Sequence, residues 1–132
     1  RVIKMLLIHD LGEIDAGDTI IYASETNELK GEEATAIKRI LSILPDGMED
    51  ELMELWYEFE AGETADSKFA KAVDRVPPLL HNIHGDGHSW KAHGITKDKV
   101  FSVNQRIENG SEALWSVMRN KLETAVDDGI LK

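Results

Sequence analysis

The sequence predicts an all-α protein in which one layer of helices packs on another. Apolar residues recur at helical spacing, for example at Leu52, Leu55 and Phe59, and turn formers such as Pro45-Asp46-Gly47 separate the apolar stretches. No stretch alternates apolar and polar residues for long, so we expect no strand. Because 42% of the 132 residues are apolar, the chain can form one domain with a sizeable core.

The elements follow from this pattern in chain order. Residues 1–11 form the first helix, and because it is apolar on nearly every side we expect it to be buried. Residues 12–30 and 84–95, rich in glycine and polar residues, are expected to be loops. Amphipathic stretches predict the remaining helices: residues 31–44, 48–61, 64–76, 96–107 and 111–127. Pro77-Pro78 interrupts or kinks the chain, and a helix can continue over residues 79–83.

Composition excludes several classes of function. The 15 Lys and Arg residues against 25 Asp and Glu residues leave a net charge of -10, which argues against a nucleic-acid or lipid-binding surface. The chain has no cysteine, so disulfides and thiolate zinc sites are excluded and a reducing cytoplasm fits. No apolar run reaches the roughly 18 residues that a membrane helix needs.

His9 and Asp10 stand at the end of the first helix, just ahead of Gly12. Burying a charge is costly unless the charge is paired or bound to a metal. Imidazole and carboxylate are ligands of first-row transition metals, so this pair is a candidate metal site. A surface histidine beside an acid is the alternative for so short a motif.

Three other acids are candidates for the same site. Glu13 follows His9 by four residues, so on a continuing helix it shares the face of the pair, where a carboxylate can serve as general acid or base. Asp18 follows Gly17 and can face a substrate. Asp74 interrupts an apolar helical run and therefore needs a partner, either a metal or a buried basic residue.

The other conspicuous side chains are assigned to surface or core. His84 and His88 have the i, i+4 spacing that can hold zinc on a helix, but Gly85 and Gly87 between them favour a surface loop. We expect the large aromatic side chains to pack in the core, with the last of them within the fold or at a subunit contact: Trp56, Phe59, Phe69 and Trp115.

Together these residues resemble the HD-domain metal-dependent phosphohydrolases, and within them the small 5'-deoxynucleotidases. The resemblance covers nearly the whole chain and rests on these segments: Leu7-Ile8-His9-Asp10-Leu11-Gly12-Glu13, Gly17-Asp18, Glu32-Glu33-Ala34, Glu54-Leu55-Trp56, Glu58-Phe59-Glu60, Phe69-Ala70-Lys71-Ala72-Val73-Asp74-Arg75, Ser89-Trp90-Lys91 and His93-Gly94-Ile95. It implies an HD-domain-like helical bundle and a single domain over residues 1–132.

The resemblance also implies roles for single residues. His9, Asp10 and Asp74 would bind the metal, Glu13 would serve the attacking water, and Asp18 would contact the nucleotide. Members of this family carry a further His ligand on a helix before the His-Asp pair, so we expect residues 1–132 to lack that N-terminal helix. Mixed His and carboxylate ligation suits a divalent transition metal, namely Mn, Co, Fe, Ni or Zn.

We therefore expect a cytoplasmic enzyme that releases phosphate from (deoxy)nucleoside 5'-monophosphates. A homodimer is expected from the resemblance and from the many apolar residues of the last two helices. Two alternatives stay open: a non-catalytic helical module for dimerisation or ligand sensing, and a phosphohydrolase that acts on other nucleotides.

Overall fold

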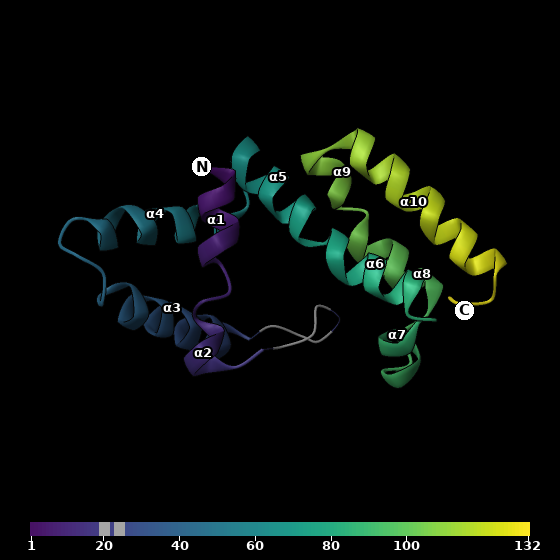
Figure 1. Ribbon diagram of the computed structural model, residues 1–132, viewed down its shortest axis with the longest axis horizontal. Coiled ribbons are helices and arrows are strands. Elements are labelled where there is room, and N and C mark those ends of the chain that lie inside the picture. The colour runs from purple at the N-terminus through teal and green to yellow at the C-terminus, as the bar shows by residue number, and fades with distance from the viewer. Residues whose placement is uncertain (19–21, 23–25) are drawn as a thin grey trace. The chain divides into compact units, whose positions relative to one another are not determined.

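The computed structural model describes residues 1–18, 22 and 26–132, which form helices joined by turns (Figure 1). No strand occurs in these residues, which confirms the predicted all-α class. The chain divides into two compact units, Arg1–Ala70 and Lys71–Lys132. The boundary between the units falls inside one continuous helix, α5 (Ala65–Asp74).

The described residues of the first unit form four helices and the beginning of α5. The helices are α1 (Val2–Ile8), α2 (Glu13–Ala16), α3 (Asn27–Leu41) and α4 (Met48–Ala61). α4 packs against both α1 and α3, and α2 packs against α3. The side chains of the core come from all the longer helices: Met5, Ile8, Ile37, Leu41, Leu55, Trp56, Phe59 and Ala70.

The prediction that the first helix is buried all round is wrong for the described residues. Met5 and Ile8 are buried, but the side chains of Ile3 and Leu7 are 73% and 72% exposed. Within the first unit α4 packs against one side of α1, so apolar side chains on other sides of α1 remain exposed to solvent. The core assignment of Phe69 is also wrong, because it is 42% exposed while its neighbour Ala70 takes the buried position.

The predicted loop over residues 12–30 is only partly confirmed. Residues 19–21 and 23–25 of it lie outside the described residues. Glu13–Ala16 forms the short helix α2, and α3 begins at Asn27, four residues before the predicted start at Gly31. Thr26 explains the earlier start, since its Oγ1 accepts a hydrogen bond of 3.2 Å from the backbone N–H of Leu29 and so caps the helix.

The second unit contains the shorter helices and the long C-terminal one. These are α6 (Val76–His84), α7 (His88–Ala92), α8 (Lys97–Asn104), α9 (Ile107–Gly110) and α10 (Glu112–Asp127). Pro77-Pro78 lies in the first turn of α6, where proline is tolerated, so the predicted interruption is confirmed. α10 packs against α6, α8 and α9, around these buried side chains: Leu79, Trp90, Val100, Ile107, Trp115, Met118 and Leu122.

The loop predicted over residues 84–95 contains helix α7, and its cap comes from another helix. Oδ1 of Asn82, on α6, accepts hydrogen bonds from the backbone N–H groups of Ser89 and Trp90, at 3.1 and 3.2 Å. These N–H groups begin α7 and have no partner within the helix. Gly87 precedes them with φ of 67°, and a Cβ there would meet the carbonyl oxygen of Ile130 at 2.7 Å. Helix formation here depends on contacts that local periodicity does not reveal.

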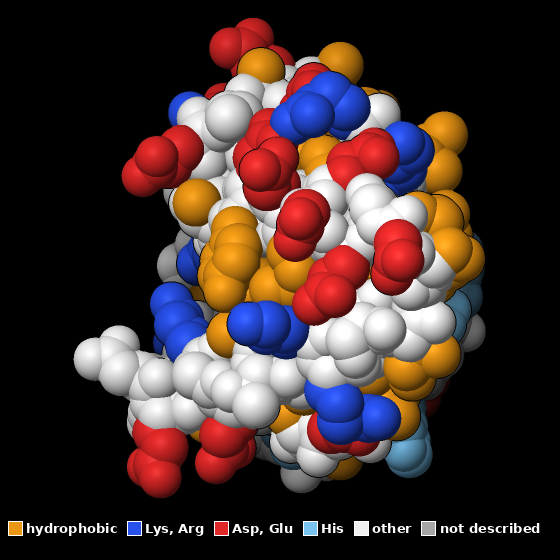
Figure 2. Space-filling model, turned by 90° about the vertical axis from the view of Figure 1, so that its left-hand side faces the viewer, with side chains coloured by type: hydrophobic (Ala, Val, Ile, Leu, Met, Phe, Trp, Pro, Cys, Tyr) orange, Lys and Arg blue, Asp and Glu red, His pale blue; other side chains and the backbone are white. Residues whose placement is uncertain are grey.

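The surface carries acidic side chains spread over the face drawn in Figure 2, with Lys and Arg side chains set singly among them. Among the described residues, some cations are paired with acids across helices, as Lys4 is with Glu51 at 2.8 Å and Arg39 with Asp15 at 2.8 Å. This face therefore has no basic stripe of the kind that binds nucleic acid. In the described part of the chain, no helix is both long and apolar enough to pass through a membrane.

Candidate metal centre

The end of α1 holds the imidazole of His9 in one orientation. His9 is the C-terminal cap of the helix, with φ and ψ of -58° and -35°, and its backbone N–H bonds to the carbonyl of Met5. Its Nδ1 lies 2.7 Å from the carbonyl oxygen of Leu6. Because a carbonyl oxygen only accepts, Nδ1 carries the hydrogen and donates it. Nε2 of a neutral His9 then presents a lone pair, the state in which imidazole binds a metal.

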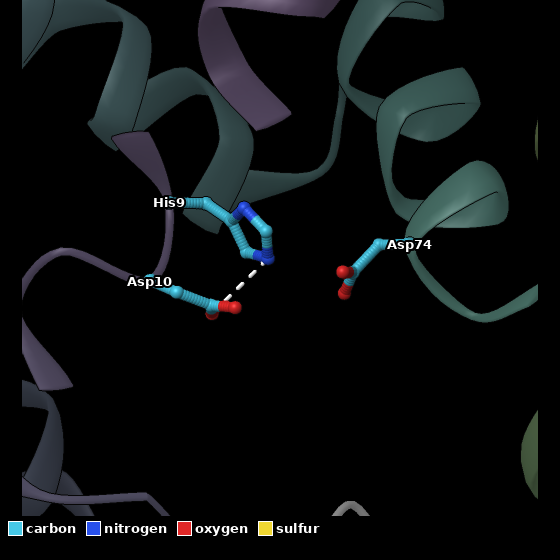
Figure 3. Close-up of side chains that lie close together, drawn as sticks. All are labelled: His9, Asp10 and Asp74. Atoms are coloured by element: carbon cyan, nitrogen blue, oxygen red, sulfur yellow. Dashed lines mark ion pairs between the residues drawn. The ribbon is translucent and has the colours of Figure 1, made fainter. Parts of the chain in front are cut away.

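Asp10 places a second acceptor beside this lone pair. Oδ1 of Asp10 lies 3.1 Å from Nε2 of His9, and Figure 3 marks this contact with a dashed line. The His9 side chain is only 12% exposed, whereas that of Asp10 is 63% exposed and open to solvent. Two acceptor atoms at this distance need a proton or a cation between them. The pair therefore suits a divalent cation that both atoms ligate.

Glu13 is next to the pair although the helix does not continue through it. α1 ends at Ile8 and α2 begins at Glu13, with turns between them, so the condition of a continuing helix is not met. The chain lies close against α3 at Gly12, where a Cβ would lie 3.2 Å from the carbonyl oxygen of Glu33. The turn still brings the side chain of Glu13 into hydrogen bonds with Asp10 and Asp18.

These neighbours change the acidity of Glu13. The pKa of its carboxyl is raised to about 7, first because burial disfavours the charged form and then because Asp10 and Asp18 repel a further negative charge. The hydrogen bonds to the same two residues act in the same direction. A carboxyl with such a pKa can hold and release a proton near neutral pH, as a general acid or base must.

Asp74 is the last residue of α5, the helix that crosses from the first unit into the second. Ala70, one helical turn before it, is fully buried in the core of the first unit. Residues four apart share a helix face, so Asp74 continues the face of α5 to which Ala70 belongs.

The four histidines of residues 81–93 lie on the surface. His81, His84, His88 and His93 are exposed, and none of them belongs to a group of three metal donors among the described residues. Nδ1 of His93, the residue after α7, lies within hydrogen-bond distance, 2.9 Å, of the carbonyl oxygen of Ser89. The surface assignment of these side chains is confirmed, although His84 and His88 lie in α6 and α7 and not in a loop.

Comparisons with known proteins identify the family of this chain. A family model described as the HD domain matches residues 1–115. The chain belongs to the HD-domain family. This HD domain is similar to a solved protein named a predicted metal-dependent phosphohydrolase, from Magnetospirillum magnetotacticum, with 45% identity and a TM-score of 0.88. The match covers 98% of this chain and 67% of the other.

Curated relatives of the HD domain carry a more specific name. The chain is 35% identical over 81 residues to the 5'-deoxynucleotidase HDDC2 of Homo sapiens, and 33% identical over 81 residues to that of Bos taurus. Each match covers 61% of this chain and 40% of the relative. The HD domain described here thus spans about two fifths of the length of these relatives. The resemblance to the HD-domain family and to its deoxynucleotidase members is confirmed.

Two residues beside the site were assigned from sequence to the core alone. Trp56 and Phe59 of α4 are indeed buried, at 4% and 5% exposed, but both also contact His9. Their i, i+3 spacing indicates a shared face of α4 and does not reveal what that face meets. The contact with His9 arises only because α4 packs against α1.

Proposed function

We propose that this chain forms the metal-binding part of a phosphohydrolase that releases phosphate from (deoxy)nucleoside 5'-monophosphates. The observation that carries the proposal is the pair of acceptors, Nε2 of His9 and Oδ1 of Asp10, 3.1 Å apart with the tautomer of His9 set by Leu6. The names of the similar proteins support the reaction and the substrate class. The family match over residues 1–115 runs through both units and supports one HD-type domain over residues 1–132.

We propose His9, Asp10 and Asp74 as the protein ligands of the metal. Together they supply one imidazole and two carboxylates, a set of donors that can hold a metal ion. The donor types suit Mn, Co, Fe, Ni or Zn. For Asp74 the further support is α5 itself, because the helix continues from the buried Ala70 to the carboxylate without a break.

A divalent metal bound by these ligands supplies positive charge for the phosphate oxygens and makes water more acidic near neutral pH. Glu13 orients the attacking water and takes up the proton that this water loses. As the oxygen of that water bonds to phosphorus, the bond between phosphorus and the 5'-oxygen breaks, and Glu13 returns the proton to the leaving oxygen. Asp18, hydrogen-bonded to Glu13 and exposed beside it, contacts the nucleotide.

This function predicts metal in the purified protein and phosphate release from a narrow set of substrates. Metal content is measured by elemental analysis, and phosphate is then assayed with a panel of nucleoside mono-, di- and triphosphates, cyclic nucleotides and their deoxy forms. We expect turnover of 5'-monophosphates only. Turnover of cyclic nucleotides or nucleoside polyphosphates would show that the substrate class is not the 5'-monophosphates. Bound metal without turnover of any nucleotide would favour a ligand-sensing or dimerisation module.

We also infer a homodimer and a cytoplasmic location, the latter from the lack of cysteine. The last helix supports the dimer because Val117 of α10 is an apolar side chain that is 53% exposed. Sedimentation at micromolar concentration should show twice the mass of one chain, and Val117→Lys should shift it toward one chain. Ile43→Lys is the control, since Ile43 is 75% exposed in the first unit, away from α10 along the chain. A single-chain mass for the unchanged protein would contradict the dimer.

A further inference from the structure

Two aromatic side chains of α4 contact His9 from the core of the first unit. Nε1–H of Trp56 donates a hydrogen bond of 3.3 Å to the backbone carbonyl of His9. The ring of Phe59 lies with its centroid 4.7 Å from that of the imidazole, at an interplanar angle of 44°. Both aromatic residues are buried and one helical turn apart on α4, so their positions are set by packing.

The two contacts restrain different parts of His9. The carbonyls at the C-terminus of a helix lack donors within that helix, and the indole N–H of Trp56 supplies one to His9. This bond holds the backbone where α1 ends and turns into Asp10. Phe59 limits rotation of the imidazole about its side-chain bonds, while the carbonyl of Leu6 selects the hydrogen on Nδ1. The combined result is one direction for Nε2, toward Oδ1 of Asp10.

We propose that Trp56 and Phe59 are positioning residues that orient His9 for metal binding. The inference rests on the proposed function, in which Nε2 of His9 is a metal ligand. Residues that orient a metal ligand typically change metal affinity about 10–100-fold when they are replaced. Trp56 and Phe59 would do so through the backbone and the ring of His9, without touching the metal.

The test compares buried aromatic residues that differ in this contact. Trp56→Phe removes the indole N–H, and Phe59→Leu removes the ring. Trp90→Phe is the matched control, because Trp90 is 2% exposed, as buried as Trp56, but lies on α7 of the second unit. In the full-length protein we measure Co²⁺ affinity by competition with a chromophoric chelator, thermal unfolding without metal, and the imidazole tautomers by long-range ¹⁵N–¹H spectra without metal.

We expect Trp56→Phe and Phe59→Leu each to weaken Co²⁺ binding by about 10–100-fold and to give His9 a mixture of tautomers. Trp90→Phe should leave affinity and tautomer unchanged at a similar loss of thermal stability. Equal losses of affinity in Trp56→Phe and Trp90→Phe would show a purely structural role and overturn the proposal. So would an unchanged His9 spectrum in both α4 variants.

The positioning role and the metal site can fail separately in this experiment. Wild-type protein that binds no Co²⁺ would overturn the metal site. The tautomer of His9 in the metal-free protein would still decide whether Trp56 and Phe59 orient the ring. Wild-type protein that binds Co²⁺, with α4 variants that bind it equally well, would overturn the positioning role alone.

Discussion

Asp74→Asn should remove the metal from the protein while its helicity stays nearly intact. The change replaces an anionic oxygen donor with a neutral amide of the same shape. Metal affinity should therefore fall, while the packing of the helices should stay the same. Replacing a residue that only orients a metal ligand already costs about 10–100-fold in metal affinity, so loss of a direct ligand should cost at least the upper end of that range. Metal content by elemental analysis and far-ultraviolet circular dichroism on the same sample measure both effects.

Asp66→Asn is the control for this prediction. Asp66 is an acid in the first turn of the same helix, α5, and pairs with Arg1 at 3.2 Å. The control loses the same charge from the same helix and should keep its metal. Metal content in the Asp74→Asn protein equal to that of wild type would remove Asp74 from the ligand set and leave a salt bridge as its role.

Glu13→Gln should abolish most turnover while metal and substrate remain bound. Glutamine keeps the shape of the side chain, but its amide can neither take up nor release a proton as the carboxyl of Glu13 can. General acid or base catalysis is typically worth about 10²–10⁴-fold, and kcat should fall by that factor. Metal content, kcat and KM are measured on the same preparation of the full-length protein.

Asp15→Asn provides the comparison within α2. Asp15 lies two residues after Glu13 on the same short helix and pairs with Arg39, whose guanidinium lowers the pKa of the Asp15 carboxyl. Its loss should leave kcat unchanged. Metal missing from Glu13→Gln would make Glu13 a ligand, and an unchanged kcat would make it a bystander.

Several features of the first unit were predictable because their causes are local. The amphipathic period of residues 48–61 reproduces α4 at both ends, where Gly47 and Gly62 adopt φ of 89° and 64°. The turns at these glycines need backbone conformations that other residues rarely adopt, so the helix boundaries are readable in the chain. The adjacency of His9 and Asp10 is likewise a property of two neighbouring residues at a helix end.

Other features were missed because their causes lie in neighbouring helices and not in the local sequence pattern. α7 is capped by Asn82 from α6, and the single turn of α2 packs against α3. Neither contact shows in the local sequence pattern of these short helices, so glycine and polar residues alone predicted loops there. The apolar pattern of α1 predicted burial on all sides, but the exposure of Ile3 and Leu7 depends on which neighbours cover the helix.

The sequence by itself determined the all-α class, the main amphipathic helices and the candidate residues His9, Asp10, Glu13, Asp18 and Asp74. Hydrophobic periodicity and turn residues act over a few positions, and one chain carries that information directly. Only the tertiary structure decided how His9 is held, with Leu6, Trp56 and Phe59 meeting its ring and backbone. Those contacts require α4 to pack on α1. Hydrophobic periodicity shows which face of a helix is apolar, but it does not show which other helix packs against that face.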